Sequence, residues 1–125
     1  MREKAINGLI SLFSGKRNLK KGKKVKFFRT GSTVWSVAFS PDGRYLAAGS
    51  ADHYAHIYNL ETGNKVNSFK TVGSVWSVAF SPDGKYLAAG SGDNYAYIYN
   101  LKKGKKVKSF KNSNTVNSVA FSPDG

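Results

Sequence analysis

The chain has 125 residues, 40% of them hydrophobic, which is enough to build the core of one ordinary domain. It contains no cysteine, so disulfide frameworks and thiolate metal sites are excluded and the redox compartment is left open. The net charge of +13 lies mainly in two lysine clusters, at 16–26 and 101–108, and no apolar run is long enough to cross a bilayer.

Residues 1–18 form a divergent N-terminal segment. Its apolar stretch, Ala5 to Phe13, lacks the small-residue cleavage site of a signal peptide. We expect no transmembrane segment; the compartment is unknown, with the cytoplasm as our expectation. The apolar residues have near-helical spacing, so a short amphipathic helix is one hypothesis and a pair of degenerate strands is another. Our prediction is a poorly packed extended segment.

The rest of the chain repeats one phrase. Residues 31–71 and 72–112 are identical at 29 of 41 positions, and 113–125 matches the start of the second unit at 9 of 13 positions. "LKKGKKVKFF" at 19–28 corresponds to "LKKGKKVKSF" at 101–110 with one difference. A period of about 40 residues indicates a fold made of repeated supersecondary units.

Each unit has the pattern of four short strands. "VWSVAFS" (34–40) is a continuous apolar run, typical of a strand buried on both faces. "SPDG" is a turn, after which "RYLAAGS" (44–50) and "YAHIYNL" (54–60) are joined by a tight connection around Asp52. "KVNSF" (65–69) alternates apolar and polar residues, like an outer strand with one wet face.

Carried through the repeats, this pattern predicts an all-β chain with no helix between 30 and 121. The expected strands are 23–28, 34–40, 44–49, 54–59, 65–69, 75–81, 85–90, 95–99, 106–110 and 116–121.

Over about residues 19–125 the chain resembles the WD-repeat β-propellers. The resemblance is carried by "VWSVAFSPDG", by "LAAGS", by an Asp in the next turn (Asp52, Asp93) and by "IYNL" with a following Gly. The Trp-Asp pair of the family is replaced by Tyr58-Asn59 and Tyr99-Asn100, and the Gly-His pair is absent.

The resemblance implies a partial β-propeller made of four-stranded antiparallel WD-repeat-like blades. It divides 19–125 as follows: an outer strand at 19–29, a blade at 33–70, a blade at 74–111, and the inner strand of the next blade at 115–125. In the family, Asp, His, Ser/Thr and Trp are typically linked by hydrogen bonds within a blade. Asp52 and Asp93 would keep the turn part of that network as structural residues, and tyrosine hydroxyls are candidates for the rest.

The sequence shows no group of residues with the spacing of a catalytic or metal-binding site. His53 and His56 lie three residues apart, which on a strand directs them to opposite faces, and their counterparts are Asn94 and Tyr97. The aspartates stand singly, without a paired carboxylate or base. We therefore expect no catalytic residues, no metal and no cofactor.

Trp35 and Trp76 begin the expected innermost strands, near one set of loops. Tryptophan there is either core or a binding anchor, and our interpretation favours core. With His53 and Asn94 from the adjacent turns, they are the candidate partner-binding residues.

The lysine clusters belong to the hairpin between third and fourth strands, on the rim opposite Asp52 and Asp93. Lysine at a sheet edge commonly prevents unwanted strand pairing, which is the interpretation that we favour. The alternative is an anion-binding stripe for phosphate backbones or anionic lipid. Its candidate residues are Lys20, Lys21, Lys23, Lys24, Lys102, Lys103, Lys105 and Lys106.

The function hypothesis is a non-catalytic protein–protein interaction scaffold, a fragment of a larger propeller, with other proteins as partners. The alternative is nucleic-acid or anionic-surface binding through the lysine-rich rim. A closed propeller needs about four blades or more, so this chain must be completed from outside itself. Our leading hypothesis is that the missing blades lie beyond Gly125. Self-association of interlocking chains is the other hypothesis, and it requires residues 1–18 to act as a second and third strand.

Overall fold

The computed structural model describes residues 2–6, 9–13 and 24–125, with side chains from residue 30 onward. The described residues form strands and no helix, which confirms the all-β prediction. The strands are β1 (Arg2–Ile6), β2 (Leu9–Phe13), β3 (Lys24–Arg29), β4 (Val34–Phe39), β5 (Tyr45–Ser50), β6 (Tyr54–Asn59), β7 (Lys65–Lys70), β8 (Val75–Phe80), β9 (Tyr86–Ser91), β10 (Tyr95–Asn100) and β11 (Lys105–Lys111).

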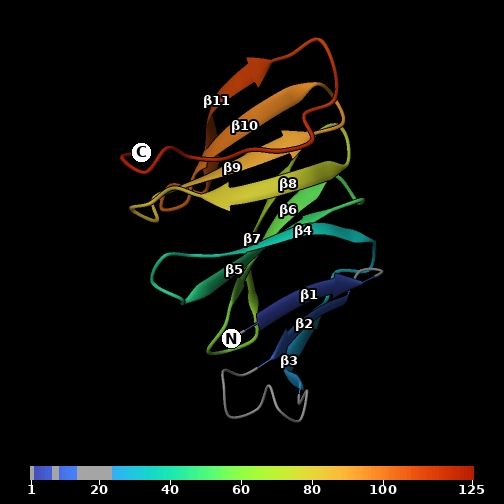
Figure 1. Ribbon diagram of the computed structural model, residues 1–125, viewed down its shortest axis with the longest axis vertical. Coiled ribbons are helices and arrows are strands. Elements are labelled where there is room, and N and C mark those ends of the chain that lie inside the picture. The colour runs from blue at the N-terminus through green and yellow to red at the C-terminus, as the bar shows by residue number, and fades with distance from the viewer. Residues whose placement is uncertain (1, 7–8, 14–23) are drawn as a thin grey trace.

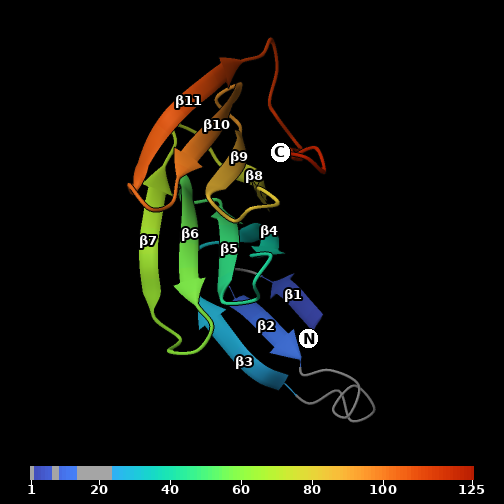
Figure 2. The same ribbon diagram turned by 90° about the vertical axis from the view of Figure 1, so that its left-hand side faces the viewer.

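These strands form three antiparallel sheets that lie one above another (Figure 1). Sheet A has the order β1-β2-β3, sheet B the order β4-β5-β6-β7, and sheet C the order β8-β9-β10-β11. Sheets B and C are the four-stranded blades that the repeat predicts. The stack is open, with sheet A at one end and sheet C at the other (Figure 2).

The N-terminal segment is extended rather than helical. β1 pairs antiparallel with β2 from Arg2↔Phe13 to Ile6↔Leu9, and β2 pairs with β3. β1 contacts β4 as β5 contacts β8, so β1 and β2 hold the second and third positions of a blade. The degenerate-strand hypothesis therefore describes this segment, and the helix hypothesis is wrong.

Sheet B is buried on both faces because its second strand alternates two apolar sets. Ala47 points into a cluster between sheets B and C, whereas Leu46 and Ala48 join a second cluster on the opposite side of the sheet. Fully burying a leucine side chain contributes about 1.5–3 kcal/mol. Phe69 of β7 stacks on Tyr99 of β10, with ring centroids 4.4 Å apart, and closes the outer side of the first cluster.

Glycine in β5 lets neighbouring sheets approach closely. A Cβ atom at Gly49 would lie 2.8 Å from Cγ1 and 2.9 Å from the carbonyl oxygen of Val75, distances that no side chain tolerates. At Gly90, one repeat later, a Cβ would lie 2.7 Å from the carbonyl oxygen of Val116. The "AAGS" motif thus packs each sheet against the innermost strand of the next repeat.

The strand expected at 116–121 is not formed, because these residues have no ladder partner among those described. The segment still occupies the place that β8 takes one repeat earlier. The Val119 amide donates to Ser77 Oγ at 3.2 Å, just as the Val78 amide donates to Ser36 Oγ at 3.2 Å. Residues 113–125 therefore cross sheet C in the position of an innermost strand without belonging to a sheet.

Candidate functional site

Asp93 organises the connection between β9 and β10. One carboxylate oxygen accepts from the Tyr95 amide at 3.0 Å, and the other accepts from the Val72 amide at 3.1 Å and from the Tyr97 hydroxyl. Burial opposes ionisation of Asp93, but the hydrogen bonds from Tyr97 and the two amides outweigh it and hold the pKa of this carboxyl below its usual value. The geometry of Asp93 is therefore that of a residue that stabilises the turn.

The matching turn of sheet B uses a histidine instead of a tyrosine. Asp52 accepts from the Tyr54 amide at 3.0 Å and lies 2.8 Å from Nε2 of His56, while Nδ1 of His56 lies 3.3 Å from Ser68 Oγ. Because the carboxylate only accepts, Nε2 of His56 donates to Asp52, and Nδ1 lies opposite the serine hydroxyl. Sequence spacing had not indicated this chain of three side chains, which joins β6 to β7.

A Ser–His–Asp chain raises the question of nucleophilic catalysis. In hydrolases Nε2 faces the serine and Nδ1 faces the aspartate, whereas His56 has the opposite arrangement. The His56 side chain is also buried, at 4% exposure, and substrate must reach a nucleophile and its base. The geometry fits a structural bridge between strands.

Asp42 and Asp83 are likewise held in their turns. Hydrogen bonds from the Arg44 amide and the Ser40 hydroxyl hold the pKa of Asp42 below its usual value. Asp83 has the same pattern one repeat later, with the pKa lowered by the Ser81 hydroxyl and the Lys85 amide.

The loop edge, defined here as residues 30–33, 51–53, 71–74 and 92–94, brings the two tryptophans together. Trp35 and Trp76 lie with ring centroids 4.7 Å apart and planes inclined by 43°. Each lies at a register shift in its strand pair, so neither has a partner in the ladder. A β-bulge of this kind re-aims a side chain, and here it places two indoles side by side.

The two tryptophans differ in environment. Trp35 is 46% exposed, whereas Trp76 is half-buried and its indole Nε1 has no hydrogen-bond partner. Gly92 makes room for Trp76, since a Cβ there would lie 3.1 Å from Nε1. The favoured interpretation of both tryptophans as core therefore describes Trp76 better than Trp35.

His53 and Asn94 lie in the tight turns of the same edge. Both have left-handed backbones, with φ of 76° and 74°, a region that Asn and His enter more readily than most residues. His53 is exposed and Asn94 is half-buried. His53 and Asn94 thus lie in the loop edge, and Trp35 and Trp76 lie at the start of the strands that follow it, β4 and β8.

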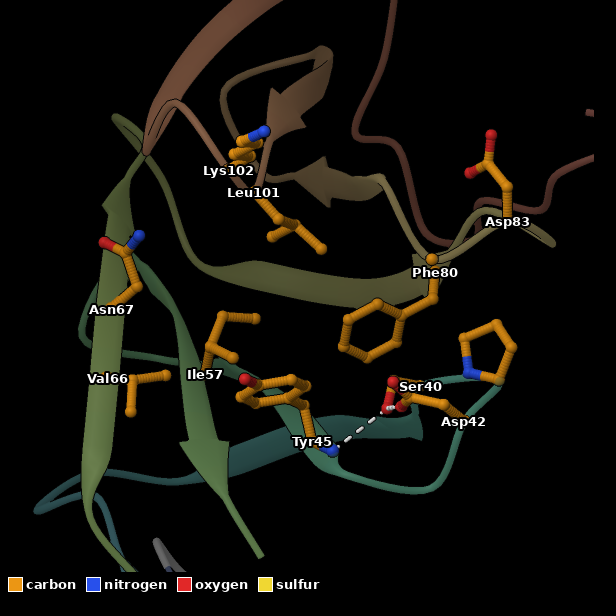
Figure 3. Close-up of a pocket in the computed structure, with 12 residues that line it drawn as sticks. Ser40, Asp42, Tyr45, Ile57, Val66, Asn67, Phe80, Asp83, Leu101 and Lys102 are labelled. Carbon is orange, nitrogen blue, oxygen red and sulfur yellow. Dashed lines mark hydrogen bonds between the residues drawn. The ribbon is translucent and has the colours of Figure 1, made fainter.

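A cavity of about 430 Å³ lies between sheets B and C at the opposite edge (Figure 3). Figure 3 shows Phe80 facing Tyr45 and Ile57 inside it, with the carboxylates of Asp42 and Asp83 at its rim. Among the lining residues, Lys102 is the one that the sequence analysis gives as a candidate binding residue. The cavity was missed because it forms between two sheets, and single-strand patterns carry no sign of it. Its other lining residues are Ser40, Pro41, Val66, Asn67, Gly84 and Leu101.

The structure describes five of the eight candidate anion-binding lysines. Lys102, Lys103, Lys105 and Lys106 are exposed at the β10–β11 hairpin, and no described acidic side chain lies within ion-pair distance of them. Lys106 Nζ lies 5.3 Å from the ring centroid of Tyr97. Lys24 begins β3, and the candidates Lys20, Lys21 and Lys23 fall outside the described residues.

Repeated four-stranded sheets, packed face to face with equivalent turns, define the blades of a β-propeller. A family model described as "WD domain, G-beta repeat" matches residues 22–59, 63–100 and 104–125, and the chain belongs to this family. Proteins of the family are typically non-catalytic scaffolds that bind other proteins. No match was found among curated proteins.

The boundaries of the matched sequence units do not coincide with the boundaries of the sheets. The first unit, 22–59, contains β3 of sheet A together with β4, β5 and β6 of sheet B. The second, 63–100, contains β7 of sheet B and the first three strands of sheet C. Each four-stranded sheet is therefore assembled from two successive units.

Two further observations apply to the part of the chain that the structure describes. No group of three or more His, Cys, Asp or Glu side chains is arranged to hold a metal ion there. Nor does that part contain a helix with the length and apolar character of a membrane span.

Proposed function

We propose that this chain is a non-catalytic protein-interaction scaffold, forming part of a larger propeller, that binds its partner on the loop edge through Trp35. The observation that carries the proposal is the tryptophan pair: a half-exposed indole supported by a second indole on adjacent blades. Tryptophan is enriched among the residues that dominate protein-binding energy, because it offers a large and rigid contact area.

The surroundings of Trp35 support this role. Val72 of the same edge is 76% exposed, which adds apolar surface beside the polar turn residues His53 and Asn94. The carboxylates of Asp52 and Asp93 in this edge accept hydrogen bonds from backbone amides and side chains, and these bonds hold the turns in place. An apolar anchor with polar surroundings is the usual anatomy of a protein-binding patch.

The test compares a loop-edge variant with a matched variant on the opposite edge. A partner is isolated with the unaltered chain, purified, and its binding measured by calorimetry. Trp35→Ala is expected to raise Kd by about tenfold to a thousandfold, the range of a hot-spot residue, whereas Lys102→Ala leaves it unchanged. Equal affinity of the unaltered chain and Trp35→Ala would contradict the proposal.

The exposed lysines of the β10–β11 hairpin support one alternative, binding to nucleic acid or an anionic surface. The affinity of a phosphate-backbone binder falls steeply as salt rises, because counterions are released on binding. Measurement of binding to RNA, DNA and anionic vesicles at low and high salt separates the two functions. Strong, salt-sensitive binding that is lost in Lys103→Glu and kept in Trp35→Ala would favour the alternative.

A further inference from the structure

We propose that sheet C of one copy of this chain, with its residues 116–121, docks against sheet A of a second copy. In the assembly, residues 116–121 become the innermost strand of the second copy's sheet A by pairing with β1. Two copies exchange these contacts reciprocally and close a ring.

The outer face of sheet C is crossed by residues 113–125 and is covered by no sheet of the described residues. On sheet B, Ile57 and Phe69 point toward sheet C and are buried, with Phe69 only 4% exposed. Their equivalents 41 residues later on sheet C are Ile98, which is half-buried, and Phe110, which is 53% exposed. The residue types suited to sheet-on-sheet packing are therefore repeated on a face that no described sheet covers.

The occupant is indicated by what each end of the stack lacks. Among the described residues sheet A has three strands, and β1 is its edge in the position where sheets B and C continue to an innermost strand. Residues 116–121 lie in the position of an innermost strand and form no ladder with a described strand, although the Val116 amide donates to the carbonyl oxygen of Ser91 at 3.1 Å. An edge strand presents a row of unpaired amides and carbonyls, which an extended segment of suitable sequence satisfies.

The segment is already placed for this role. Ser77 accepts from the Val119 amide as Ser36 accepts from the Val78 amide, and Val116 lies over Gly90 as Val75 lies over Gly49. In β8 the same sequence, "VAF", then pairs with the "LAA" of β9. In 116–121 the Val119 amide is bonded to Ser77, as its equivalent in β8 is bonded to Ser36, and the segment forms no ladder with a described strand, which leaves its ladder positions for β1 of another copy.

In the proposed assembly the two features belong to different copies, because they lie at opposite ends of the stack (Figures 1 and 2). One chain supplies three sheets, and propellers have about four to eight blades. Two chains supply twice three, that is six sheets, with every sheet completed to four strands. The two interfaces are then identical and related by a two-fold axis. The alternative source of the missing blades, further residues of a longer protein, predicts a different behaviour of this chain in solution.

The first experiment measures the mass of the 125-residue chain by sedimentation equilibrium over a wide concentration range. The expected result is a discrete species of about twice 13.6 kDa. Salt is expected to maintain or strengthen it, since both copies carry +13 and the contact is apolar. A single-copy mass or a broad mixture of masses would overturn the proposal.

A matched pair of variants locates the contact. Ala120 and Ser113 are both exposed in the single chain, but Ala120 lies within the segment that would pair with β1. Ala120→Asp is expected to raise the dimer Kd by at least about tenfold, while Ser113→Asp leaves it unchanged. A dimer indifferent to Ala120→Asp, or equally weakened by both variants, would mean that another surface holds it together.

A cross-link makes the result independent of how well Ala120→Asp folds. The chain has no cysteine, so two single-cysteine chains of different tag length, Ala120→Cys and Glu3→Cys, can be mixed. Glu3 pairs with Leu12 as Ala88 pairs with Ile98, and Ala88 pairs with Ala79, the equivalent of Ala120. Glu3 is therefore the residue of β1 that would oppose Ala120, and disulfides form when Cα atoms come within about 7 Å. The mixed disulfide is expected to exceed that of Ala120→Cys with Lys103→Cys severalfold. Equal yields would overturn the proposal.

Discussion

The Tyr97 hydroxyl donates a hydrogen bond to the Asp93 carboxylate, and in the neighbouring blade His56 bonds Asp52 from the equivalent position. Two different side chains thus bind the equivalent oxygen, Oδ2, of the two half-buried aspartates. The two donors occupy positions 41 residues apart, so the repeat sets where the donor lies. Its chemical type differs between the blades, an imidazole in His56 and a hydroxyl in Tyr97. This relationship leads directly to the pH dependence of sheet C.

Asp93→Asn is expected to destabilise the fold by about 1–3 kcal/mol at neutral pH, the usual cost of disrupting buried hydrogen bonds. The pKa of Asp93 is lower in the folded chain, so its contribution is present above the usual value of 3.8 and is lost as pH falls through the folded pKa. Urea unfolding between pH 7 and pH 2 should therefore show the two proteins converging in acid. Asp124→Asn, in an exposed turn, serves as control; a difference that stays constant with pH would contradict the assignment.

Gly49→Ala is expected to destabilise the chain by about 1–3 kcal/mol, because the new Cβ would overlap Val75 between sheets B and C. Thermal unfolding measures the loss. The double variant with Val75→Ala should recover part of it, since the side-chain overlap is removed while the overlap with the carbonyl oxygen remains. Strict additivity of the two substitutions would show that the close approach is absent.

Much of this fold could be predicted from the sequence because the repeat sets the strand period, the turns and the order of strands together. β3 to β11 lie within a residue or two of the expected bounds. Residues 116–121 were the exception: their pattern is that of a strand, but a strand also needs a partner, and pairing is not encoded in one segment. The N-terminal strands were equally hard to predict, since the alternating pattern is weak there.

The candidate site was predicted less completely than the fold. The sequence nominated Trp35 and Trp76 separately, and only the bulges in β4 and β8 bring their rings together. The His56–Ser68 contact depends on the register of β6 against β7, which strand patterns leave undetermined. Contacts between strands or sheets are the part that single-strand reasoning cannot supply.

Alkaline conditions are expected to unfold the chain through its buried tyrosines. Burial, with the nearby Asp52 charge, raises the pKa of Tyr58 to about 12, and burial raises the pKa of Tyr97 and Tyr99 as well. Because the folded-state pKa of these tyrosines lies above the unfolded-state value of 10.0, their neutral form stabilises the fold fully below that unfolded value. This stabilisation is lost as pH rises through the folded-state pKa. Tyrosinate absorbance should therefore develop partly together with loss of strand circular dichroism. Tyr58→Phe should make that loss less steep; an unchanged profile would argue against its burial.

The two histidines form a matched pair for mutagenesis. His56→Ala is expected to cost about 2–3 kcal/mol, because it empties a buried position and removes the hydrogen bonds of His56 to the half-buried Asp52 and Ser68. His53→Gly should be neutral or stabilising, since glycine adopts the left-handed backbone of this exposed position without strain. Unfolding in urea at pH 7 compares them, and equal losses would contradict the assigned roles.

The offset between sequence units and sheets bears on how such a chain can lengthen. Since each sheet draws its outer strand from one unit and its other three strands from the unit before, a duplication of 41 residues within 31–112 adds one whole sheet wherever its boundaries fall. The inserted sheet meets its neighbours through the same Gly–Val and Phe–Tyr contacts already present between sheets B and C. Tandem duplication can therefore change the number of blades without requiring a new kind of sheet–sheet contact.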